Sequence, residues 1–223
     1  MLCAILFVGS LSPLLAQGEY VFGLLPEAQV SRSLPNEWKV VGNVESRQAL
    51  RRGRFDDNPG LDYDYLLTDV SFAFTKGIFF RRAWSLGYLL RLRDAAPAHR
   101  LFQQFVIDER YVGYRVSYRL ATDQTFSSAD PTEYRLRLRA AGELPLRGLA
   151  VDDGEHYLKA SHEYLNKWAA GQYDLETRLV AALGRQIANG HNLEIGFDYR
   201  LDNFLNGAPA HSFWTTVGWY RSF

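Results

Sequence analysis

The chain has little lysine, almost no cysteine and, after its N-terminus, no long apolar run. Only four of its 25 basic residues are lysine, and the others are arginine. Its single cysteine, Cys3, lies in a segment that we expect to be removed, so the mature chain has no thiol for a disulfide, a metal site or a nucleophile. Because no later stretch contains 18 consecutive apolar residues, a transmembrane helix is excluded.

A charge imbalance is also missing, since the formal net charge of the 223 residues is zero. A nucleic-acid-binding protein needs a basic surface that displaces counterions from phosphates, so we expect no nucleic acid partner. The five histidines do not have metal-ligand spacing, and neither a glycine-rich phosphate loop nor a GxSxG motif is present. We therefore expect no metal, no cofactor and no enzymatic activity.

The N-terminal segment 1–17, MLCAILFVGSLSPLLAQ, is apolar and ends in small residues before the polar Gly18-Glu19. This pattern is typical of a secretory signal peptide cut near Ala16 or Gln17, although no basic residue precedes the apolar run. A buried N-terminal helix or strand is the alternative. We divide the chain into the signal peptide, a mature N-terminal segment at 18–35 and a barrel at 36–223.

Alternation with period two dominates the remaining sequence. In 132–140, TEYRLRLRA, one face carries Tyr134, Leu136 and Leu138, and the other face carries three arginines. Such alternation indicates a strand with one apolar face. About ten runs of this kind occur between turn signals, and longer loops are expected at 121–131 and 145–154. The pattern predicts an all-β chain that forms one antiparallel up-and-down transmembrane β-barrel of about ten strands, with eight or twelve as alternatives.

The composition of the charged faces indicates which side of the sheet is wet. A soluble barrel exposes its charges to solvent, whereas a membrane barrel turns them into its lumen and presents apolar residues to lipid. Strand surfaces rich in arginine and acid but poor in lysine favour the lumen, where fixed Arg–carboxylate pairs avoid unpaired charge. We expect the lumen network to contain Arg115, Arg119, Arg135, Arg137, Arg139, Glu163, Glu176, Arg178, Glu194, Asp198 and Arg200.

The last residues, HSFWTTVGWYRSF, form an amphipathic run that ends at Phe223. In a closed sheet this run would pair with the first strand and leave no edge. A terminal phenylalanine on such a strand resembles the sorting signal of bacterial outer-membrane barrels, so Trp219 and Phe223 are expected to form a barrel-assembly signal. The usual aromatic two residues before the end is replaced by Arg221.

The second half of the chain is similar to the family called domain of unknown function 2490. The resemblance rests on YRLRLR at 134–139, YLKASHEYLN at 157–166, the strand with Arg178 and LEIGFDYR at 193–200. Members of that family look like exported outer-membrane barrels of Gram-negative, mostly Bacteroidota-type, bacteria. The resemblance therefore implies the barrel fold and the bacterial outer membrane, and it implies no catalytic residue.

Two arrangements could suggest chemistry. Ser161, His162 and Glu163 are consecutive, so on a strand His162 points away from its neighbours and the three cannot act as a nucleophile and base. Loop acids such as Asp152 and Asp153, together with Asp123, Asp130 or His156, could form a protease-like pair, but solvated loop residues are the simpler interpretation. The arginine ladder could line an anion pathway, and charge-compensated packing of a narrow lumen is favoured over it.

These patterns predict a non-enzymatic outer-membrane barrel with a structural, anchoring or narrow-transport role and an Arg/Glu-packed lumen. Its expected partners are outer-membrane lipids and the barrel-assembly machinery, and it is expected to be a monomer. Two alternatives stay open. One is a barrel enzyme that acts on outer-membrane lipid or peptide, and the other is a soluble periplasmic barrel of lipocalin type.

Overall fold

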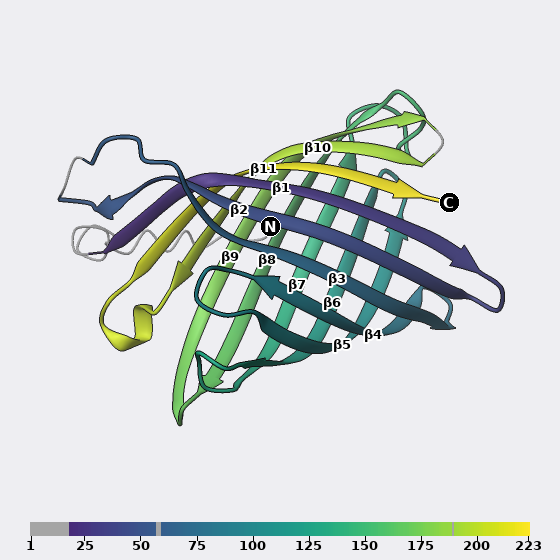
Figure 1. Ribbon diagram of the computed structural model, residues 1–223. Coiled ribbons are helices and arrows are strands. Elements are labelled where there is room, and N and C mark those ends of the chain that lie inside the picture. The colour runs from purple at the N-terminus through teal and green to yellow at the C-terminus, as the bar shows by residue number, and fades with distance from the viewer. Residues whose placement is uncertain (1–17, 57–58, 189) are drawn as a thin grey trace, which may run out of the picture.

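The computed structural model describes residues 18–56, 59–188 and 190–223, and the expected signal peptide lies outside them (Figure 1). Eleven strands and one short 3-10 helix make up the regular structure of the described residues. No helix among them is long and apolar enough to cross a membrane. The strands are β1 (Glu19–Leu34), β2 (Trp38–Arg54), β3 (Asp64–Phe79), β4 (Arg82–Leu92), β5 (Ala98–Tyr111), β6 (Tyr114–Ser127), β7 (Glu133–Pro145), β8 (His156–Ala169), β9 (Gln172–Ala188), β10 (His191–Asp202) and β11 (Ala210–Ser222), and η1 (Phe204–Asn206) precedes β11.

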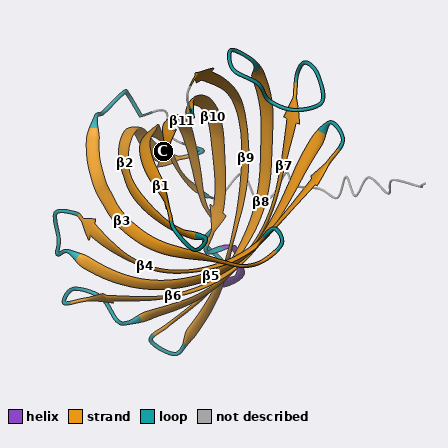
Figure 2. Ribbon diagram, turned by 90° about the vertical axis from the view of Figure 1, so that its right-hand side faces the viewer, coloured by secondary structure: helices purple, strands orange, loops and turns teal. Residues whose placement is uncertain are grey.

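Each strand pairs with its neighbours in the chain, and β1 pairs with β11 to close the barrel (Figures 1 and 2). All consecutive pairs are antiparallel, as expected for an up-and-down barrel. The closing pair is parallel, because in a barrel with an odd number of alternating strands the first and last strands run in the same direction. The expected pairing of the last strand with the first is confirmed, and the sheet has no free edge.

The alternation predicts about ten strands, and the strand it leaves out is β1. This strand begins at Glu19, so the barrel starts before residue 36 and the segment 18–35 is part of its wall. Its run Leu24-Leu25-Pro26 breaks the apolar–polar alternation on which strand recognition depends. Pro26 has no N–H to donate, and the β1–β2 register skips Leu25 and Pro26.

The connection expected at 121–131 is also shorter than its composition suggests. β6 continues to Ser127, so only residues 128–132 join it to β7. The polar residues Asp123 and Thr125 were turn-like in sequence, but in the barrel they belong to the inward face of a strand, where Arg135 and Arg100 bond to them. The loop expected at 145–154 agrees well with the observed 146–155.

The two ends of the barrel differ in their connections. At the end where β11 finishes, which we call the C-terminal end, the connections 35–37 and 80–81 are tight, and 146–155 is the one long loop of the described residues there. At the opposite end the connections 55–63 and 203–209 are longer, and η1 lies in the second of them (Figure 1). The short turn there uses positive φ at Ala170 (51°) and Gly171 (77°), as a type I′ hairpin requires.

The two faces of the sheet are inverted relative to a soluble barrel. Large apolar side chains such as Leu138, Ile195 and Phe74 are exposed on the outer surface. The inward face instead buries charged side chains, which are Asp69, Arg100, Asp123, Arg135, Glu163, Glu176, Asp198 and Arg200. Burial of charge together with exposure of apolar surface is the arrangement that the lysine-poor strand faces predict.

Candidate functional site

The barrel encloses a cavity of about 870 Å³, and all eleven strands contribute to its lining. Along β7 the lining residues run from Glu133, the first residue of the strand, to Glu143 near its end. At about 3.4 Å per residue these positions span roughly 34 Å of strand, so the cavity follows the barrel instead of forming a pit at one end. It is the candidate functional site.

The structure places every residue of the expected lumen network in the lining of this cavity. These residues are Arg115, Arg119, Arg135, Arg137, Arg139, Glu163, Glu176, Arg178, Glu194, Asp198 and Arg200. Strand periodicity explains their common orientation, since residues two apart on a strand point to the same face. The two residues of the expected assembly signal, Trp219 and Phe223, are not among the lining residues.

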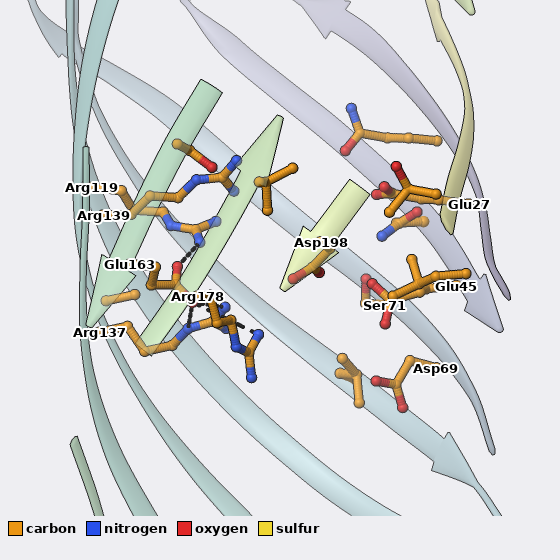
Figure 3. A pocket seen from close by; sticks show the side chains of 18 of the residues that line it. Glu27, Glu45, Asp69, Ser71, Arg119, Arg137, Arg139, Glu163, Arg178 and Asp198 are labelled. Atoms are coloured by element: carbon orange, nitrogen blue, oxygen red, sulfur yellow. Dashed lines mark hydrogen bonds and ion pairs between the residues drawn. The ribbon is translucent and has the colours of Figure 1, made fainter. Parts of the chain in front are cut away.

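Glu163 is the centre of the densest charge cluster, which Figure 3 shows in close view. Its side chain on β8 is buried, with a relative exposure of 4%. Arg119 Nη2 donates to one carboxylate oxygen at 2.5 Å, and Arg137 Nη2 donates to the other at 2.7 Å. Arg178 Nη1 lies 3.8 Å from the same carboxylate. Arginines from β6, β7 and β9 therefore converge on one acid of β8.

Asp123 forms a second centre nearer the end opposite the C-terminus. Its side chain is 1% exposed, and Arg135 Nε donates to its Oδ1 at 2.5 Å. Arg100 Nε lies 3.5 Å from the same oxygen, and Arg137 Nη1 lies 3.9 Å from the other. Arg137 thus links the two centres, because its guanidinium is within ion-pair distance of both Glu163 and Asp123.

Three strands carry an acid followed two positions later by an arginine of the same face whose guanidinium lies within 2.8 Å of the carboxylate. In β10, Arg200 donates to Asp198 at 2.6 Å, and both side chains are buried. The other two pairs are Glu45–Arg47 on β2, at 2.8 Å, and Glu176–Arg178 on β9, at 2.5 Å. This acid-x-Arg spacing was readable in the sequence, because period two alone places both groups in the lumen.

Several lining residues were not expected from the sequence. Asp69 holds Arg91 through two parallel hydrogen bonds of 2.8 and 2.6 Å, an arrangement that fixes both side chains. Tyr220 on β11 donates its hydroxyl proton to Glu27 on β1 at 2.9 Å. Glu27 was missed because β1 was not recognised as a strand, and Tyr220 was missed because the last strand was considered only for its assembly signal.

The charges that line the cavity are unequally distributed around it. The lining residues of β4–β9, here called the cationic wall, include ten cations and five acids, which are Arg91, Arg100, Arg115, Arg119, Arg135, Arg137, Arg139, Lys159, Lys167 and Arg178 with Asp123, Glu133, Glu143, Glu163 and Glu176. The lining residues of β10, β11 and β1–β3, here called the acidic wall, include six acids and two cations, which are Glu27, Glu45, Asp69, Glu194, Asp198 and Asp202 with Arg47 and Arg200. Figure 3 shows Arg119, Arg137 and Arg139 on one side and Glu27, Glu45 and Asp69 on the other.

The Ser161-His162-Glu163 run has the geometry expected for consecutive strand residues. Ser161 and Glu163 line the cavity, whereas His162 is not among the lining residues. The His162 Nε2 atom lies 2.9 Å from the Thr177 hydroxyl, and its ring packs against Tyr164 with centroids 4.4 Å apart. The barrel wall therefore separates His162 from Ser161, and the two cannot exchange a proton.

The loop acids are not brought together either. Asp123 lies in the lumen, and Asp130 pairs with Arg93 beyond the end of β6. Asp152, Asp153 and His156 lie at the C-terminal end of the barrel, where Gln186 donates to Asp153 at 2.8 Å. Among the described residues, no group of three or more His, Cys, Asp or Glu side chains could hold a metal ion.

The C-terminal residue is held in the sheet. Its N–H donates to the carbonyl of Ser31, and its own carbonyl accepts from the N–H of Ser33, so Phe223 continues the pairing of β11 with β1. The Arg221 guanidinium lies 4.0 Å from the centre of the Phe223 ring. Arg221, which stands where an aromatic was expected, thus covers the terminal ring by a cation–π contact.

The family model described as "Protein of unknown function (DUF2490)" matches residues 22–209. The chain belongs to the DUF2490 family. The match covers β2 to β10 and most of β1, so the family pattern corresponds to the barrel wall itself. Searches of curated proteins and of solved structures returned no match.

Proposed function

We propose that this DUF2490 protein is an outer-membrane β-barrel whose lumen lets small polar solutes pass. The observation that carries the proposal is a charged cavity running along a barrel whose outer surface is apolar. A soluble barrel that stores an apolar ligand has the reverse arrangement, because its interior must be apolar to hold that ligand. Lipid on the outside and water on the inside satisfy both faces of this sheet.

The positions of the exposed aromatic side chains support a membrane environment. Those at the C-terminal end include Trp38, Trp84, Tyr111, Tyr114 and Phe223, and those at the opposite end include Tyr63, Phe126, Tyr134, Trp168 and Tyr173. Between them the exposed side chains include Leu120, Leu138, Leu179, Ile195 and Val217, together with the aromatic Phe72, Tyr164 and Phe197. Membrane barrels carry two aromatic girdles at the lipid headgroups and an aliphatic band between them.

Polar side chains on the outer surface bond to one another. Gln103 accepts a hydrogen bond from Thr122 at 2.9 Å across the β5–β6 pair. Tyr173 donates to Asn166 at 2.9 Å across the β8–β9 pair. In hydrocarbon an unsatisfied polar group costs several kcal/mol, so mutual pairing is the condition for tolerating these residues there.

The unequal connections suggest an orientation in the membrane. Outer-membrane barrels have short periplasmic turns and longer external loops. By that rule the C-terminal end, with its tight connections at 35–37 and 80–81, faces the periplasm, and the loops 55–63 and 203–209 face outward. Phe223 then lies on the side from which the barrel-assembly machinery acts. The closed sheet, which leaves no strand edge for a second copy, is consistent with a monomer.

The dimensions of the cavity limit what could pass. A volume of about 870 Å³ spread over an axial length of roughly 25 Å, for strands tilted by about 40°, corresponds to a mean width on the order of 7 Å. That width admits amino acids, sugars and short peptides and excludes folded proteins. The lining arginines and acids replace the water contacts that such solutes lose on entry.

Cell fractionation and a flux assay test the proposal together. The protein should remain with outer membranes after osmotic shock and require detergent for extraction, and the refolded barrel should let arabinose into liposomes in a swelling assay. Protein-free liposomes and heat-denatured protein are the controls. Recovery in the shock fluid without detergent would contradict the membrane assignment, and vesicles that exclude arabinose would contradict the conduit.

A further inference from the structure

The lumen is nearly neutral as a whole, yet its charges are segregated. The lining contains 12 cations and 11 acids, but the cationic wall has twice as many cations as acids and the acidic wall has three times as many acids as cations. A neutral sum gives little attraction for ions of either sign. Opposed walls instead create a field across the cavity, which a surrounding apolar shell strengthens because it screens less than water.

Each wall has one charge of its predominant sign that the described residues leave without an ion pair. Arg139, on the cationic wall, has no carboxylate of the described residues within ion-pair distance, although it lines the cavity beside Arg119. Glu27, on the acidic wall, accepts a hydrogen bond from Tyr220 but has no described cation within that distance. Figure 3 shows Arg139 and Glu27 on opposite sides of the cavity.

A third group points to a polar occupant. Trp214 on β11 lines the cavity and is 3% exposed, and its indole Nε1 has no hydrogen-bond partner among the described residues. An indole N–H can only donate, so its partner must be an acceptor such as a carbonyl or carboxylate oxygen. Trp214 pairs with Gly23, four residues before Glu27 on β1, so a solute meets this donor about 13 Å along the lumen from Glu27.

We infer that the lumen selects small zwitterions, such as amino acids and short peptides, over neutral and singly charged solutes. The carboxylate of such a solute turns toward Arg139, and its ammonium group turns toward Glu27. A solute with one charge is attracted by one wall and repelled by the other, whereas a zwitterion has a favourable electrostatic interaction with both walls. The inference deepens the proposed conduit and rests on it.

Two solutes of similar size separate this inference from the conduit itself. Refolded protein in liposomes is assayed for swelling with glycylglycine, which is a zwitterion, and with N-acetylglycinamide, which is neutral. Glycylglycine should enter at least about threefold faster after correction for diffusion in water. In the double variant Arg139→Gln/Glu27→Gln that ratio should fall to about one, while the flux of the neutral solute is retained.

Arg147→Gln is the matched control, because Arg147 lies in the exposed connection 146–155 and should leave the ratio unchanged. A ratio near one in the unaltered protein, with measurable neutral flux, overturns the zwitterion inference and leaves the conduit standing. Entry of neither solute overturns the conduit. In that event calorimetric titration of the detergent-solubilised protein with glycylglycine judges the site by itself, and absence of binding overturns it as well.

Discussion

The outer and inner surfaces of this barrel are made by alternate residues of the same strands, and they obey opposite rules. On β7 the outward Leu138 is 48% exposed, while the inward neighbours Arg137 and Arg139 line the charged cavity. A step of one residue along the chain thus changes the surroundings of a side chain from an apolar surface to an ion network. The comparison teaches that the two faces should respond very differently to the same kind of substitution.

The largest effect is expected from placing a charge on the outer surface. In the proposed membrane placement Leu138→Arg should block assembly, because a cation near the middle of a membrane costs about 2–4 kcal/mol. Leu138→Ile is the matched control and should assemble normally. The measurement is the fraction of folded barrel in vesicles, read from the mobility of unheated samples on gels. Equal yields for the two variants would show that this face does not meet hydrocarbon.

Removal of a charge from the inner surface should destabilise the folded barrel somewhat less than a charge placed on the outer surface. Glu163→Gln leaves Arg119 without its carboxylate and Arg137 with only the 3.9 Å contact to Asp123, and should lower the free energy of unfolding by about 2 kcal/mol, since lumen water relieves part of the 3–5 kcal/mol seen for dry pairs. Glu194→Gln, which affects only Lys159 and Tyr157, should cost less. Reversible denaturant titrations in detergent compare the two, and an equal or larger loss for Glu194→Gln would contradict the central role of Glu163.

The smallest effect is expected where a polar side chain lies on the outer surface. His162→Leu removes the contact with Thr177, worth about 0.5–1.5 kcal/mol, and adds apolar surface to the outer face, so the free energy of unfolding should change by no more than about 1 kcal/mol. The same denaturant titration measures it. Ser161→Ala, at the adjacent inward position, provides the reference, and a loss above about 2 kcal/mol at His162 would mean that its surroundings are not apolar.

Local sequence pattern predicted most of the residues that line the cavity. β7 shows where such a pattern suffices, and β1 and β6 show where it does not. On β7 the alternation is unbroken from Tyr134 to Arg139, so the faces of its residues could be predicted one by one. On β1 the alternation is interrupted at Pro26, so the strand and its lining residue Glu27 were missed. In β6, Asp123 and its polar neighbours suggested a turn, because sequence alone cannot distinguish a polar turn from the wet face of a strand.

The sequence by itself determined which side chains share a face, because period two is a local property of the strand backbone. It also indicated that the charged face is enclosed, through arginine in place of lysine. Only the tertiary structure decided that eleven strands close with a parallel pair, which depends on the count around the whole ring. It alone decided that Arg139 and Glu27 lie across one cavity, because they come from β7 and β1, and barrel closure rather than local pattern brings such distant strands to face each other.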